Sequence, residues 1–174
     1  MKQKSFLILA IFFFFLAFSV QSVRAEDSDV SRSTLAGLQG VSVVVEELQP
    51  NVLTYATKFG LSKTQVQQDA EKMLRDGGIR IVAGNDWRKT PGCPVLYISI
   101  NTHETEKYWY AYDIKVELRQ LATLDANPRM KTLAVTWSLN MTGQANIGTL
   151  NVIRQDTGVM VGRFVQAWKV GSRK

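Results

Sequence analysis

The residues that could do nucleophilic chemistry are one cysteine, Cys93, and one histidine, His103. A hydrolytic triad would have to use His103 as its base, and a thiol site would pair it with Cys93. However, the two residues flank a predicted strand of about eight residues, which separates them by roughly 25 Å. No G-x-S-x-G nucleophile motif is present. The sequence therefore favours a non-catalytic protein, with a small hydrolase that uses His103 as the alternative.

The sequence gives equally little indication of a metal site, a phosphate-binding site or a glycosidase site. His103 lies in the polar run NTHETE, residues 101–106, which we expect to be the tip of a hairpin. A stable metal site needs three or four ligands, and no second histidine exists to help. Asp113 and Glu117 share a strand face, but nothing signals the cleft that paired carboxylates need. Gly77-Gly78 follow a helix and so cannot cradle a phosphate at its N-terminus. We expect no metal and no cofactor.

Side chains suited to binding a partner alternate along the stretch 95–119. Apolar residues occupy one face of its two predicted strands, and Tyr97 and Trp109 occupy the other. Lys115 and Arg119 lie on that same face. Exposed aromatic residues beside cations often form interaction surfaces. We take these four as candidate binding residues, and the alternative is that a terminal segment or a second subunit covers them.

The elements that must position these residues follow from hydrophobic periodicity. Residues 41–48, 95–102, 108–119 and 133–141 alternate between apolar and polar side chains, as half-buried strands do. A short strand is predicted at 79–82, and residues 125–128 form a turn. Such sustained alternation is typical of antiparallel sheet with one face buried and one exposed to solvent.

Two helices are predicted. The first spans residues 62–76, because Ser62 can cap it, Gln65 can complete a capping box and Gly77-Gly78 supply a left-handed stop. The second spans roughly residues 147–168. The predicted fold class is α+β: a two-layer sandwich with a mixed, mostly antiparallel five-stranded sheet and two helices on one face.

The N-terminal residues predict the cellular location of the protein. A basic start, an apolar run from Phe6 to Val20 and a small-residue exit are typical of a signal peptide, cleaved after Ala25. Residues 26–40 are a polar, flexible lead-in, and residues 41–170 form one domain. The mature chain has 18 basic and 15 acidic residues, which gives little reason to expect nucleic-acid binding. We expect a periplasmic or secreted location, with no stable membrane span after signal removal.

A resemblance adds to these expectations. The runs GIRIV (78–82), PVLYISINT (94–102) and YAYDIKVEL (110–118) resemble those of short exported bacterial proteins of unknown function. The element order is loosely similar to small α/β envelope domains such as the N-terminal domain of TolB. This resemblance implies a fold and no functional residues. The predicted function is an exported, non-catalytic binding or assembly module of the cell envelope, whose partner is another envelope protein or a second copy of the chain.

Overall fold

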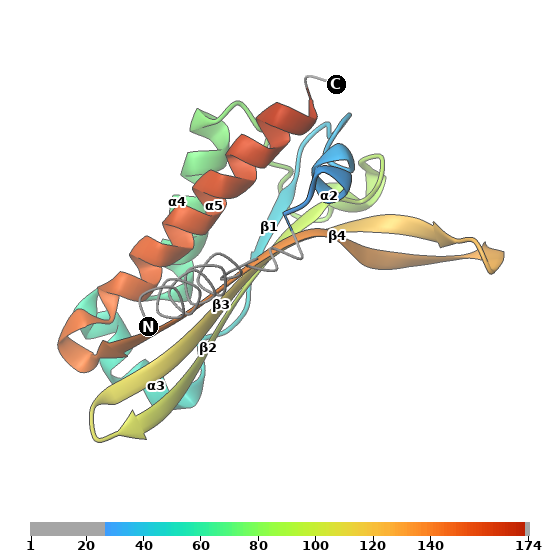
Figure 1. The fold of residues 1–174 in the computed structure, drawn as a ribbon. Coiled ribbons are helices and arrows are strands. Elements are labelled where there is room, and N and C mark those ends of the chain that lie inside the picture. The colour runs from blue at the N-terminus through green and yellow to red at the C-terminus, as the bar shows by residue number, and fades with distance from the viewer. Residues whose placement is uncertain (1–26, 173–174) are drawn as a thin grey trace, which may run out of the picture.

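The computed structural model describes residues 27–172, so the predicted signal peptide and its cleavage site after Ala25 lie outside the described residues. Two long helices cover one face of a mixed sheet, which confirms the α+β class (Figure 1). The sheet has the order β1-β2-β3-β4, in which β1 is parallel to β2 and the other pairs are antiparallel. Its strands are β1 (Ser42–Val45), β2 (Val95–Glu106), β3 (Trp109–Leu124) and β4 (Asn127–Asn146).

The prediction of five strands is wrong, because the sheet has four. The segment 79–82 contributes one isolated parallel bridge, between Val41 and Ile81, instead of a strand. Its first residue is still held by the preceding helix, since the Ile79 amide donates to the carbonyl of Leu74 at 2.9 Å. The chain then turns away at Gly84, which adopts a φ of +54°. Too few residues remain between these two points for a ladder to form.

The prediction of two helices is also incomplete. Residues 27–172 contain three helices of seven or more residues: α3 (Pro50–Ala56), α4 (Lys63–Asp76) and α5 (Asn151–Gly171). Helix α3 begins at a proline, which suits a first helical turn, and lies in what the sequence presents as an irregular connection. A one-turn helix α2 (Asp29–Ser33) and three short 3₁₀ segments complete the described elements: η1 (Thr57–Phe59), η2 (Asp86–Lys89) and η3 (Ile147–Thr149).

Helix α4 agrees with its prediction to within one residue. Ser62 caps it by accepting from the Gln65 amide at 3.2 Å. The helix ends at Asp76 with Gly77 as its C-cap, and Gly78 takes the left-handed conformation with a φ of +91°. An L side chain rarely adopts that conformation, which explains the glycine. The helix bounded in this way lies beside α5 over the sheet (Figure 1).

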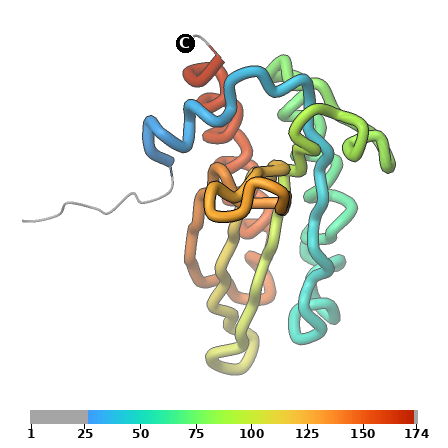
Figure 2. The backbone as a smooth tube through the Cα atoms, turned by 90° about the vertical axis from the view of Figure 1, so that its right-hand side faces the viewer, coloured from blue at the N-terminus to red at the C-terminus, as the bar shows by residue number. Residues whose placement is uncertain are grey.

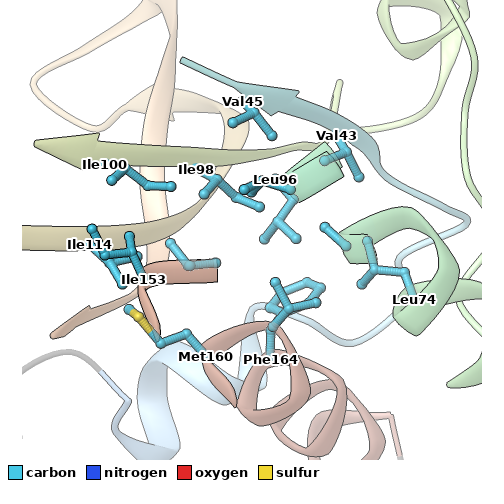
Figure 3. Close-up of a cluster of buried hydrophobic side chains, with 14 of the residues drawn as sticks. Val43, Val45, Leu74, Leu96, Ile98, Ile100, Ile114, Ile153, Met160 and Phe164 are labelled. Atoms are coloured by element: carbon cyan, nitrogen blue, oxygen red, sulfur yellow. The ribbon is translucent and has the colours of Figure 1, made fainter. Parts of the chain in front are cut away.

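The core lies between the sheet and this helix pair. Figure 3 shows Leu96, Ile98 and Ile114 from the sheet facing Phe164 and Met160 from α5. All five side chains are buried. Trp137 of β4 packs edge-on against Phe164, with ring centroids 5.0 Å apart. The apolar positions predicted within 95–102 and 110–118 therefore build the core, whereas Leu133 and Val135 of the strand predicted at 133–141 are exposed.

The strands β3 and β4 continue past the body of the sheet as a two-stranded hairpin, residues 119–135, which we call the arm. The last residue of β3 that pairs with β2 is Arg119, opposite Val95. Beyond it, β3 and β4 pair only with each other up to the turn after Leu124. The arm projects clear of the two layers (Figures 1 and 2). The sequence predicts its turn but not its length, because the strand predicted at 133–141 covers only half of β4.

The segment predicted as a polar lead-in, residues 26–40, makes specific contacts where it is described. Leu35 is fully buried in the core, and α2 lies against α5. Arg32 donates two hydrogen bonds of 2.8 Å to the Asp27 carboxylate, which also accepts from Trp137 Nε1 at 2.8 Å. We call residues 27–35 the strap. The hydrogen bond from Arg32, and then that from Trp137, hold the pKa of Asp27 below its ordinary value.

The strap gives a pH-dependent prediction. Asp27→Ala should lower the free energy of unfolding by about 1–2 kcal/mol at pH 7. Because the folded state depresses this pKa, the contribution is present above the ordinary aspartate pKa of about 3.9 and is lost as the pH falls through the lower folded value. Urea unfolding of the wild-type chain and of Asp27→Ala, at pH 7 and at about pH 3, would measure the difference in their free energies of unfolding. If the free energies of unfolding of the two proteins differ equally at both pH values, the ionised Asp27 carboxylate does not contribute to stability as predicted.

Candidate functional site

Within residues 27–172, no helix covers the face of the sheet opposite α4 and α5, and we call this the open face (Figure 1). The strand register sets out its side chains in rows. Asn101 of β2, Asp113 of β3 and Thr142 of β4 lie opposite one another in one row. The next row holds His103, Ala111 and Gln144. Most of these side chains are exposed, so the open face presents mainly hydrogen-bonding groups to solvent.

These two rows form a shallow concavity of about 980 Å³, wide open to solvent. Its polar lining comes from Gln49, Asn101, His103, Asp113, Thr142 and Gln144. Gln49 approaches from the loop before α3, where its amide donates to Asn101 at 3.1 Å and accepts from the Thr102 amide at 3.0 Å. The lining contains one carboxylate and no lysine or arginine. It therefore suits a neutral, polar ligand surface, with several donors and acceptors in fixed register.

Three of the four predicted binding residues gather at the other end of the open face. The Arg119 guanidinium lies 3.7 Å from the centre of the Tyr97 ring, a stacked cation–π contact. Arg119 also donates to Glu117 at 2.8 and 3.0 Å, and Lys115 lies 4.0 Å from the same carboxylate. Burial raises the pKa of Tyr97, and its contact with Glu46 adds to the shift. Both cations therefore already have an acidic neighbour.

Trp109, the fourth predicted residue, lies elsewhere. It is 46% exposed at the start of β3, eight residues before Glu117. At roughly 3.3 Å per residue the two positions are about 26 Å apart. The structure therefore places Tyr97, Lys115 and Arg119 together and separates Trp109 from them. The concavity lies between these two ends.

The groups considered for catalysis remain apart. His103 lies within β2, opposite Ala111, and not in the hairpin tip where the sequence places it. Cys93 is half-buried ahead of β2, where its thiol donates to the Arg88 carbonyl at 3.5 Å. Asp113 and Glu117 are four residues apart on one strand, about 13 Å, which exceeds the separation used in glycoside hydrolysis. Within residues 27–172, no group of three or more His, Cys, Asp or Glu side chains could hold a metal ion.

Sequence reasoning singles out His103 and Asp113 for other roles, and it misses Gln49, Thr142 and Gln144 of the concavity lining. The predicted strand ends at Met141, so Thr142 and Gln144 fall outside it. The signal was nevertheless present, because polar residues continue to alternate at 140, 142 and 144. Gln49 reaches the site only through the turn before α3, and no local pattern indicates such a contact.

Comparisons with known proteins do not assign the chain to a family. No protein-family model and no curated protein matches it. Among solved structures, it is similar to a dodecamer of a PelC variant from Paraburkholderia phytofirmans, with a TM-score of 0.42 and 16% sequence identity. The match covers 76% of this chain and 89% of that one. The similarity to the N-terminal domain of TolB gains no support. Separately, no helix in residues 27–172 is both long and apolar enough to cross a membrane.

Proposed function

We propose that the chain is an exported, non-catalytic module of the bacterial cell envelope that binds its partner on the open face. The observation that carries this proposal is the uncovered concavity, with its hydrogen-bonding groups held in strand register. The sheet fixes the backbone positions of these groups, and the Gln49–Asn101 hydrogen bond already orders two of the side chains, which lowers the entropy cost of binding. The partner is another envelope protein or a second copy of the chain.

The separation of the reactive groups supports binding over hydrolysis. A general base must reach the proton it removes, directly or through one water molecule. His103 is exposed on an open strand, and the thiol of Cys93 lies beyond the opposite end of β2. The concavity is wide and shallow, whereas reacting groups are usually enclosed by a site that excludes water.

Site-specific photo-crosslinking tests the proposal directly. A photoreactive residue at Asn140 or Gln144 faces the partner, while one at Gln155 on α5 faces away. In cells that produce the protein natively, the first two positions should give the same crosslinked partner and the third should not. Equal crosslinking from all three positions would argue against binding on this face. N-terminal sequencing of the purified protein tests the export step, with Glu26 as the expected first residue.

Substitutions locate the partner along the open face. Tyr97→Ser removes the stacking surface under Arg119, and Trp109→Ser removes the exposed ring at the other end. A partner that spans the concavity should bind about tenfold more weakly to each variant, about 1.4 kcal/mol. Titration calorimetry with the purified partner, once crosslinking has identified it, would measure these affinities. Val159→Ser on α5 is the control. Unchanged affinity in both variants would remove both ends of the face from the binding site.

A further inference from the structure

The arm exposes apolar side chains that nothing in the described chain covers. Five large hydrophobic residues of the arm are 40–54% exposed: Leu121, Leu124, Met130, Leu133 and Val135. A two-stranded hairpin is only marginally stable alone in water. Apolar exposure of this kind on a projecting element usually marks a surface that contacts something else.

One face of the arm combines three of these apolar residues, Leu121, Leu133 and Val135, with cations. Leu121 lies opposite Leu133, Val135 lies opposite Arg119, and Lys131 lies opposite Thr123. Strand alternation places Leu133, Val135 and Lys131 on the same side, together with Arg129. Binding at a membrane interface is strengthened both by buried apolar area and by the attraction of basic side chains to anionic lipids.

The charge of the chain is concentrated in the same region. The loop 84–93 lies against the base of the arm, where the Gly92 carbonyl accepts from the Leu121 amide at 2.7 Å. The arm and this loop together hold five basic and two acidic residues. The rest of residues 27–172 holds eleven basic and twelve acidic residues. The net positive charge of the described chain therefore lies entirely on the arm and its neighbouring loop.

We propose that the arm binds flat on the surface of an anionic phospholipid bilayer, through the face that carries Leu121, Leu133, Val135, Arg129 and Lys131. Anionic headgroups complement the charge, and the apolar side chains bury in the interface between headgroups and acyl chains. The turn, Asp125 to Pro128, is polar and acidic, which disfavours insertion tip first. Pairing with a second arm along β4 would bring Arg129 and Lys131 of both copies together, and such charges oppose edge-to-edge pairing. This face adjoins Arg119 at the end of the open face, but its lipid-binding residues lie outside the concavity.

Vesicle flotation of the mature chain, residues 26–174, tests the charge component. The chain should float with phosphatidylcholine vesicles that contain about one third phosphatidylglycerol, and not with phosphatidylcholine alone. Each basic residue near such a surface contributes about fivefold, so Arg129→Gln with Lys131→Gln should weaken partitioning roughly 25-fold. The matched control is Lys72→Gln with Arg75→Gln on α4, which removes the same charge from exposed positions and should change partitioning less than about twofold.

The apolar component needs a second pair of variants. Leu121→Ser with Leu133→Ser should reduce flotation at least tenfold, while Val159→Ser, an exposed position on α5, should not. About 0.5 M salt should release the wild-type chain. The proposal would be overturned if the α4 control lost as much partitioning as the Arg129 and Lys131 variant. Binding to phosphatidylcholine alone would also overturn it. A failure to float with the anionic vesicles would also overturn it, and a dimer in solution that the leucine changes dissociate would then show that the arm binds a second copy.

Discussion

Phe164→Ala should lower the free energy of unfolding by about 3–5 kcal/mol, the largest effect expected for a single substitution described above. Phe164 is fully buried on α5, where it faces the sheet and contacts the Trp137 ring edge-on (Figure 3). Its removal forfeits the transfer free energy of the ring and leaves a cavity between the two layers. Trp137 also loses its aromatic neighbour, and with it the packing that aligns its indole nitrogen with Asp27.

Urea denaturation followed by tryptophan fluorescence would measure this loss. Val159→Ala is the matched control on the same helix, because Val159 is 52% exposed, and we expect it to change the free energy by less than about 0.5 kcal/mol. Similar effects for the two variants would mean that α5 does not face the sheet through Phe164. The two-layer arrangement itself would then be in doubt.

Gly143→Ala should destabilise the fold by about 1–3 kcal/mol. A Cβ atom at this position would lie 2.3 Å from the Tyr112 hydroxyl and 2.4 Å from Cζ of its ring. Tyr112 lies opposite Gly143 in the sheet, and its hydroxyl donates to the Asp156 carboxylate on α5. The ring cannot move aside without loss of that hydrogen bond, which ties the sheet to the helix.

Gly158→Ala is the matched control for this substitution. Its Cβ would make an ordinary contact of 3.7 Å with Met73, and alanine in a helix interior is favoured over glycine by about 1 kcal/mol. We therefore expect opposite signs for the two glycine changes. A tyrosinate titration adds a second readout, because burial and then the Asp156 contact raise the pKa of Tyr112 to about 12. In Gly143→Ala the displaced ring should ionise closer to the ordinary tyrosine value of about 10.

Local signals in the sequence predict the parts of this fold that are determined locally. Ser62 and Gly78 bound α4 because a cap and a left-handed residue act within one helical turn. Alternation identifies the buried face of β2 and β3, because successive side chains point to opposite faces and the apolar ones lie on the buried face. The isolated bridge at Ile81 was predicted as a strand because a short apolar run does not reveal whether a partner strand is in reach.

The candidate site depends on long-range pairing, which explains why it was predicted only in part. Tyr97 and Arg119 meet because the register of β2 and β3 brings their ends together. Trp109 shares their polar face by alternation, but alternation says nothing about distance along the strand. The concavity needs β4 to extend to Asn146 and Gln49 to fold back from another segment. Neither condition leaves a pattern in a window of a few residues.

The position of the strap has a consequence for the order in which the fold is completed. The carbonyl of Arg32 approaches so close to Gly171 that a Cβ there would lie 2.3 Å from it. The first and last described segments therefore contact each other, and contacts of such long sequence separation slow folding. Docking of the strap must therefore wait until the final turn of α5 has formed. A chain truncated before Gly171 should accordingly leave Leu35 open to solvent, which hydrogen exchange of the strap would report.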